Sequence, residues 1–362
     1  MLIKLNLKNF ANHTDLSLNF SHFNLFYGLD NVGKTNLLEA IHFFSSHFFN
    51  RVTTSSDLIY HLKSYASVTA VFDKMNERTK QRFLVQENKI SLYHQEKPTN
   101  LSAFYGWIPI IYFSETTNLF KNPFQRERFL DLGSRQINPT YNALLQENKQ
   151  KKIEWKNIID KKSQKDSFQL CELQKTELLM GEVFYQQTQI QNRFIEMLNK
   201  QIRLLLKNEF IDFKMPFKIQ FLPWKKLNWD DSSDVFAKKV QKHLLNMRLE
   251  IDVAKKQENV LKNNFVFLFL SKCLIFSQSE KKTLELIVQL ALANLIQHEI
   301  KNDVLFLLDN LFLFDFISQD KIFRILKSLK QFIITTKELS FVSPLLLAEN
   351  RLKIWQIVKR DV

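Results

Sequence analysis

The segment Gly28-Leu29-Asp30-Asn31-Val32-Gly33-Lys34-Thr35 has the residue types and the spacing of a phosphate-binding loop. Glycine at its first and sixth positions allows the backbone to curl, so that N–H groups point at a phosphate. Lys34 offers a cation to the β- and γ-phosphate oxygens, and Thr35 offers a hydroxyl ligand for Mg²⁺. An ordinary glycine-containing turn beside a helix is the alternative, but two of the five glycines in the chain fall here. The pattern predicts a site for a nucleoside triphosphate, ATP with Mg²⁺, formed by residues 28–36 and ending at Asn36.

A second group on the metal side of the site follows an apolar run near the C-terminus. Val304–Leu308 is apolar throughout and is followed directly by Asp309. A buried strand that ends in Asp, paired with a phosphate loop, is the arrangement that holds Mg²⁺ in P-loop NTPases. We therefore predict that Thr35 and Asp309 bind the metal.

The elements around these residues alternate in type. Phe23–Tyr27 is a short apolar run, as expected for a buried strand, and the apolar residues after Thr35 recur at helical spacing. Glu172–Lys207 has the pattern of a long helix. Further apolar runs suggest strands of a sheet shared by the N- and C-terminal thirds. These runs are Phe265–Leu270, Val304–Leu308 and Phe332–Ile334.

Charge points to a polyanionic partner. Lys and Arg number 51 against 37 Asp and Glu, a net charge of +14. Such an excess favours nucleic acid through counterion release, although a general compositional bias towards lysine would give the same excess. Candidate contacts are Arg126, Arg128 and the lysine-rich run Lys149–Lys165, for which a solvated helical face is the alternative. No recognition motif for base sequence is evident.

Other functional classes find little support. Cys171 and Cys273 show no metal-ligand spacing and suit a reducing compartment. The longest apolar run is far shorter than the roughly 20 residues of a membrane span. We expect a cytoplasmic protein without a membrane segment.

The motifs together resemble the RecF family of bacterial DNA replication and repair proteins. The likeness is strongest through Gly33–Ile41, where Asn-Leu-Leu-Glu-Ala-Ile follows the lysine and threonine. It continues through the following segments, in the family's order: Leu5–Phe10, Phe113–Glu115, Arg126–Asp131, Ser277–Gln278, Lys282–Thr283, Leu307–Asp309, Asp315 and Phe332–Thr336.

The resemblance implies an α/β fold, an ABC/SMC-like P-loop ATPase head with an inserted, mostly helical lobe. The expected divisions are an N-terminal ATPase part at 1–124, a helical lobe at 125–261 and a C-terminal ATPase part at 262–362. It also implies an ATP-dependent homodimer in which Ser277 and Gln278 reach the nucleotide of the partner. Family members bind DNA at single-strand/double-strand junctions or gaps without sequence specificity. They act with RecR and RecO to support recombinase loading and the SOS response.

The sequence departs from the family in ways that bear on hydrolysis. Asn310 stands where the family has a second acid, and an amide can position water but cannot accept its proton. Asp30-Asn31 replaces the usual Asn-Gly, and Asn tolerates a left-handed position. Ser279 replaces a glycine, and Lys255–Asn259 stands where the family has a Gly-Pro-His-Arg-Asp-type segment. With Asp315 as the candidate D-loop acid, these changes predict at most a weak DNA-dependent ATPase.

Alternative interpretations remain open. Ser277 with Glu280 has the pattern of a helix capping box as well as of a signature motif. The chain could be a nucleotide-bound scaffold for DNA or RecR that has lost hydrolysis. A P-loop kinase or small-molecule NTPase is a further alternative, which the segment Ser277–Thr283 disfavours.

Overall fold

The computed structural model describes residues 1–46, 55–74, 77–87, 89–100, 108–160, 167–210, 217–249, 260–269 and 277–358. The chain forms two compact units. Unit 1 contains Met1–Asn118, Gln201–Lys214 and Cys273–Val362, and unit 2 contains Leu119–Lys200 and Met215–Lys272. The sequence-based divisions after residues 124 and 261 stay a proposal, and the two schemes differ for residues 119–124, 201–214 and 262–272.

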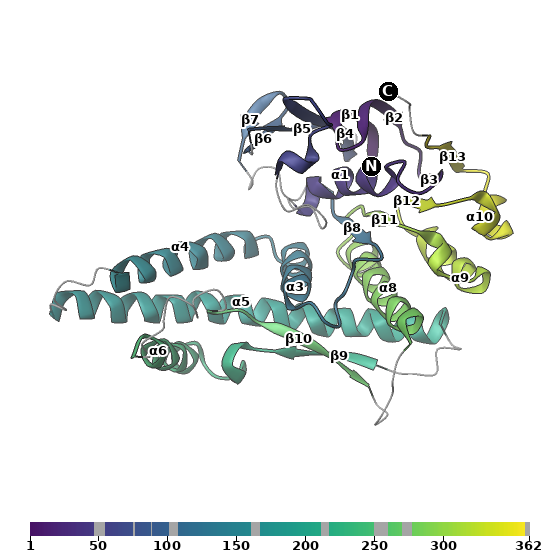
Figure 1. Ribbon diagram of the computed structural model, residues 1–362. Coiled ribbons are helices and arrows are strands. Elements are labelled where there is room, and N and C mark those ends of the chain that lie inside the picture. The colour runs from purple at the N-terminus through teal and green to yellow at the C-terminus, as the bar shows by residue number, and fades with distance from the viewer. Residues whose placement is uncertain are drawn as a thin grey trace. The chain divides into compact units, whose positions relative to one another are not determined.

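A five-stranded parallel sheet forms one layer of unit 1 (Figure 1). Its strands, in spatial order, are β13 (Leu352–Gln356), β3 (Phe23–Tyr27), β12 (Gln331–Thr336), β11 (Leu305–Leu308) and β8 (Ile110–Phe113). Each pair of neighbours is parallel. Strands β3, β8, β11 and β12 are almost entirely buried, which explains their continuous apolar runs. The prediction that the N- and C-terminal thirds share one sheet is therefore confirmed.

A six-stranded antiparallel sheet forms the second layer of unit 1. Its strands, in spatial order, are β2 (His13–Asn19), β1 (Leu2–Phe10), β4 (Tyr65–Lys74), β5 (Glu77–Gln86), β6 (Lys89–His94) and β7 (Lys97–Thr99). Helix α1 (Lys34–Ser46) packs on this sheet through Phe43, whose ring lies 4.3 Å from that of Phe83. One apolar core joins α1 to residues of both sheets, so the helix that follows the phosphate loop is held firmly.

Further elements complete unit 1. They are η1 (Ser55–Leu58), α8 (Gln278–Asn294), the π-helical η4 (Leu295–Glu299), η5 (Leu311–Leu313), α9 (Phe316–Leu326), η6 (Leu339–Phe341) and α10 (Pro344–Leu347).

Unit 2 is mostly helical and has its own apolar core. Its elements are α3 (Pro123–Ile137), α4 (Tyr141–Asp160), most of α5 (Ser167–Asn208), β9 (Phe217–Leu222), η2 (Trp224–Lys226), α6 (Ser233–Leu249) and β10 (Asn264–Phe269). The predicted long helix at 172–207 is confirmed as part of α5. In the part of the chain that the structure describes, no helix is both long and apolar enough to cross a membrane.

One strand prediction was half right. Of the apolar run at Phe265–Leu270, the described residues Phe265–Phe269 do form a strand, β10, but this strand pairs antiparallel with β9 and does not join the parallel sheet. The run is only half-buried, as suits a two-stranded sheet. An apolar run indicates a strand, but it does not indicate which partner the strand will find.

Candidate nucleotide-binding site

The phosphate loop lies between the end of β3 and the start of α1, as the sequence predicted. Gly33 has φ +101°, a left-handed conformation that L side chains rarely adopt. A Cβ there would lie 2.4 Å from Asn12 Oδ1 and 2.5 Å from His13 Nε2. Asn31 also has positive φ, at 64°, which agrees with the expected tolerance of Asn at this position. The loop is therefore a tight backbone cradle that only glycine fits at Gly33.

Lys34 is folded back over this cradle. Its Nζ donates to the carbonyl oxygens of Gly28 at 2.6 Å and Leu29 at 2.7 Å, and the residue is buried. Burial lowers the pKa of Lys34, which the nearby carboxylates of Asp30 and Asp309 oppose. The ammonium is thus held at the loop by weak carbonyl acceptors, which phosphate oxygens can replace with stronger charge-assisted bonds.

Asp309 lies directly after β11 and faces the start of α1. Its Oδ2 accepts from Thr35 Oγ1 at 2.8 Å and its Oδ1 from Thr335 Oγ1 at 2.6 Å. The residue is fully buried. A hydroxyl and a carboxylate side by side form the oxygen-donor pair that Mg²⁺ prefers when phosphate and water supply its other ligands. The side chains therefore fit the predicted metal, and they meet because β3 and β11 both lie beside β12 in a parallel sheet.

Asp30 forms an ion pair with a residue that the sequence analysis did not identify. Lys337, just after β12, places its Nζ 2.9 Å from Asp30 Oδ2. This hydrogen bond lowers the pKa of the Asp30 carboxyl and raises that of Lys337. The negative charge that departs from the family pattern is thus neutralised at the loop itself.

Asn310 also has an unforeseen partner. It adopts a left-handed conformation with φ 63°, and its Nδ2 donates to Glu115 Oε1 at 2.9 Å. Glu115 follows β8, as Asn310 follows β11. The signal for both missed residues was polarity just after a buried strand of the parallel sheet.

The signature segment begins helix α8. Ser277 caps this helix: its Oγ accepts from Glu280 N at 3.2 Å, and Ser277 N donates to Glu280 Oε2 at 2.8 Å. The capping-box interpretation is confirmed. Ser277 and Gln278 are exposed, so capping leaves them accessible. Their role towards a partner's nucleotide stays a prediction.

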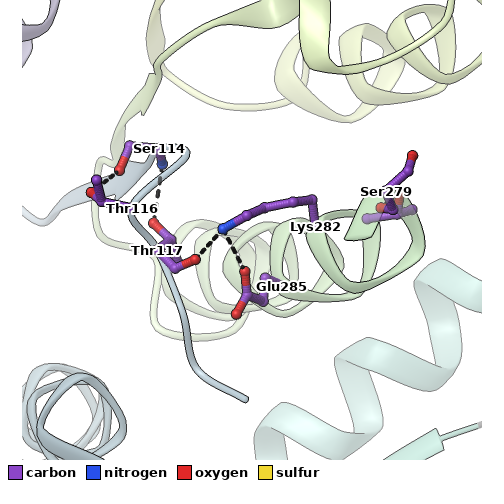
Figure 2. A network of polar contacts seen from close by, with 7 residues as sticks. Ser114, Thr116, Thr117, Ser279, Lys282 and Glu285 are labelled. Carbon is purple, nitrogen blue, oxygen red and sulfur yellow. Dashed lines mark hydrogen bonds and ion pairs between the residues drawn. The ribbon is translucent and has the colours of Figure 1, made fainter. Parts of the chain in front are cut away.

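Helix α8 is joined to the segment after β8 (Figure 2). Lys282 donates to the carbonyl oxygen of Thr117 and lies 3.1 Å from Glu285 Oε2. The signature helix and the turn that carries Glu115 are therefore directly connected within unit 1.

The remaining predicted residues have identifiable local contacts. Asp315 caps α9 by accepting from Ser318 N at 2.8 Å, which gives it a structural task beside the predicted one. Arg126 donates to Asn264 Oδ1 and to the carbonyl oxygens of Leu119 and Phe120. Burial lowers its pKa.

Arg126 thus binds inside unit 2, whereas Arg128 on α3 is exposed. A role of either residue in DNA binding stays a prediction. Residues 161–165 of the lysine-rich run and the segment Lys255–Asn259 lie outside the described residues.

Comparison with known proteins agrees with the geometry. No family model matches the chain. The chain is 26% identical to a protein of Lactobacillus johnsonii named DNA replication and repair protein RecF, over 99% of this chain and 95% of that protein. A protein of the same name from Streptococcus equi subsp. zooepidemicus is 32% identical over 38% of each chain.

Two solved structures share the fold. One is the recombination mediator protein RecF with ATPrS in the RecFOR pathway, with a TM-score of 0.78 at 18% identity, covering 99% of this chain and 96% of that one. The other is RecF with ATP, with the same TM-score at 20% identity and coverage of 93% and 92%. The fold and the site define an ABC/SMC-like P-loop ATPase head. Within that class, the chain is similar to RecF proteins over nearly its whole length.

Proposed function

We propose that the protein binds ATP with Mg²⁺ at the site formed by Gly28–Asn36 and Asp309, and that it uses this binding in DNA replication and recombinational repair. The observation that carries the proposal is the contact of Thr35 with Asp309 beside a buried Lys34. The likeness to proteins named for DNA replication and repair, and to structures of RecF with ATP, supports both parts.

The site residues divide the work of binding. Backbone N–H groups of the loop, together with the N-terminus of α1, hold the phosphates, and Lys34 Nζ turns from the loop carbonyls to the β- and γ-oxygens. Thr35 and Asp309 hold Mg²⁺, which neutralises charge on the phosphates. Thr335 fixes the second oxygen of Asp309 and thereby its orientation.

The finer role follows the family. We propose a cytoplasmic protein that binds single-strand/double-strand junctions or gaps without sequence specificity, and that forms an ATP-dependent homodimer. RecR and RecO are the proposed partners, with support of recombinase loading and the SOS response as the outcome. Ser277 and Gln278 would contact the nucleotide of the second copy, and their exposure at the start of α8 supports this role.

A nucleotide-binding experiment tests the proposal. Titration with fluorescent mant-ATP and Mg²⁺ should give saturable binding that Lys34→Ala weakens at least about tenfold, because a charge-assisted bond to phosphate is lost. Lys97→Ala, on the exposed strand β7, is the matched control and should bind as the wild type does. Equal binding by wild type and Lys34→Ala would contradict the proposal.

A second candidate function is a nucleotide-bound scaffold that does not hydrolyse ATP. Asn310 favours it, because this side chain occupies the position of the family's second acid. ATP turnover on gapped DNA separates the two: turnover that Lys34→Ala abolishes would exclude a pure scaffold. Retention of unhydrolysed ATP alongside DNA binding would favour it.

A further inference from the structure

The carboxylate of Glu115 lies beside Asn310, the residue that occupies the position of the family's second acid. Strands β8 and β11 are parallel neighbours, with Phe113 opposite Leu308. Glu115 and Asn310 each follow two residues after this pair, so both lie beyond the same edge of the sheet. Asn310 Nδ2 donates to Glu115 Oε1 at 2.9 Å.

Hydrogen bonds connect this carboxylate to the metal-side residues. The backbone N–H of Asn310 donates to Thr335 Oγ1 at 2.9 Å, and Thr335 Oγ1 donates to Asp309 Oδ1 at 2.6 Å. Asp309 in turn accepts from Thr35. Glu115 is thus linked, through Asn310 and Thr335, to the residues that would hold the metal.

The turn that carries Glu115 is itself fixed, as Figure 2 shows. The fully buried Ser114 donates from its backbone N to Thr117 Oγ1 at 3.0 Å, and Thr117 N donates back to Ser114 O at 3.0 Å. The Ser114 and Thr116 hydroxyls are 2.8 Å apart. Lys282 of α8 binds the Thr117 carbonyl from the other side.

Glu115 is an acid at this edge that remains available for chemistry. Asp309 is buried and accepts from the hydroxyls of Thr35, Thr335 and Tyr112, and Asp30 is paired with Lys337. Glu115 is exposed, and among the described residues no donor other than Asn310 reaches its carboxylate. An accessible carboxylate oriented by a neutral amide can accept a proton from a water molecule.

We propose that Glu115 takes the place of the missing second acid and serves as the general base of ATP hydrolysis. The inference rests on the proposed ATP binding. The water oxygen bonds to the γ-phosphorus while the bond from that phosphorus to the β–γ bridging oxygen breaks, and its electron pair leaves with ADP. The proton of the water passes to Glu115 and then to solvent. Asn310 positions the Glu115 carboxylate and does not itself accept a proton.

The test is Glu115→Gln. Glutamine keeps an oxygen that accepts from Asn310 Nδ2, so the connection between β8 and β11 is preserved while the base is removed. Turnover should fall about 10²–10⁴-fold, and the dissociation constant for mant-ATP should stay within about twofold of the wild type. The matched control is Glu77→Gln on the exposed start of β5, which should leave turnover unchanged.

A readout other than turnover is the melting temperature in ATP·Mg²⁺. A ligand that binds only the folded state raises the melting temperature for as long as it persists. The Glu115→Gln variant should keep this stabilisation over hours, whereas the wild type should lose it as ATP is converted. Equal melting temperatures without nucleotide would show that both proteins are folded.

Different results separate the failure of this inference from that of the proposed function. Turnover of Glu115→Gln within about threefold of the wild type would overturn the role of Glu115. Wild-type protein that binds ATP without any turnover would also overturn it, yet would leave ATP binding intact. Absence of mant-ATP binding by the wild type would reject the proposed function itself.

Discussion

At the scale of single residues, the ion pair of Asp30 and Lys337 governs the charge of the phosphate loop. Asp30 departs from the family pattern and brings a negative charge towards a site for phosphates. Lys337 follows the end of β12, and its Nζ lies 2.9 Å from Asp30 Oδ2. The negative charge that Asp30 adds to the loop is therefore balanced by a cation that is far away in the sequence.

Removing only the cation should weaken ATP binding. In Lys337→Ala the Asp30 carboxylate repels the phosphates without a counter-charge, so we expect affinity for mant-ATP to fall about two- to fivefold at low salt. Asp30→Asn in the same background should restore it. The loss should shrink near 1 M salt, because the Debye length there is about 3 Å.

Lys337→Arg is the matched control, since it keeps the charge at this exposed position. Binding by Lys337→Ala that equals the wild type at low salt would contradict a compensating role.

The site residues predicted from the sequence belong to local sequence motifs, whereas the residues that were missed join the site through the order of the strands. Gly28–Thr35 is one continuous motif, and Asp309 directly follows the apolar strand that predicts it. Glu115 and Lys337 are marked only by polarity after an apolar run, which does not distinguish them from other residues at strand ends. They join the site only because β8 and β12 end at the same edge as β11, which the sequence alone does not reveal.

At the scale of elements, the same distinction holds. The long helix at 172–207 and the strands at 23–27 and 304–308 follow from periodicity and apolar runs within the element. The pairing of β10 with β9 joins segments some forty residues apart, and no local feature encodes it. Secondary structure was therefore largely predictable, whereas sheet membership depended on long-range packing.

Helix contact at Gly181 yields a stability prediction for unit 2. A Cβ on this α5 residue would lie 2.7 Å from Ala237 Cα on α6, a backbone atom that cannot move alone. Alanine has the better helix propensity by about 1 kcal/mol, but the clash should outweigh it. We expect Gly181→Ala to lower the free energy of unfolding by about 1–3 kcal/mol in urea titrations.

The neighbouring Glu182 is exposed on the same turn of α5 and provides the control. Glu182→Ala should change stability by no more than about 0.5 kcal/mol. A Gly181→Ala protein more stable than the wild type would show that the two helices separate easily.

A buried carboxyl makes the stability of unit 2 depend on pH. Asp131 of α3 accepts hydrogen bonds from Tyr141 of α4 at 2.7 Å and from Gln191 of α5 at 3.3 Å. Burial raises the pKa of Asp131 to about 6, and the bond from Tyr141 opposes the shift in part. The folded protein therefore holds a proton here that the unfolded chain, with a pKa of about 3.9, releases.

The direction of the pH effect follows. Between about pH 4 and about pH 6 the folded state binds more protons, so this group's contribution to the free energy of unfolding falls as pH rises, by at most about 3 kcal/mol. Asp131→Asn keeps the accepting oxygen but does not titrate. Urea unfolding should therefore show the wild type losing stability relative to this variant from pH 4.5 to pH 7. A difference that does not change with pH would disprove the assignment.

At the scale of the whole molecule, the 51 Lys and Arg residues outnumber the 37 Asp and Glu residues. Not all of these cations are available to a partner. Arg126 donates inside unit 2, Lys34 lies in the phosphate loop and Lys282 holds the turn after β8. Lys262 and Lys337 form ion pairs with Glu127 and Asp30. DNA contacts should come from other parts of the charge excess.

The proposed contact with DNA should therefore depend steeply on salt and little on sequence. Each neutralised phosphate releases condensed counterions, so the logarithm of the binding constant falls linearly with the logarithm of salt concentration. If roughly six phosphates are contacted, affinity for a gapped duplex should drop roughly a thousandfold between about 50 and about 200 mM salt. A gapped duplex of scrambled sequence should give the same curve, because the chain shows no motif that reads bases.

Fluorescence anisotropy over this range measures the salt dependence and the sequence dependence of DNA binding. Binding of mant-ATP by the same samples is the control for protein integrity. A nearly flat plot would mean that the charge excess does not serve DNA binding, and unequal curves would mean that bases are read directly.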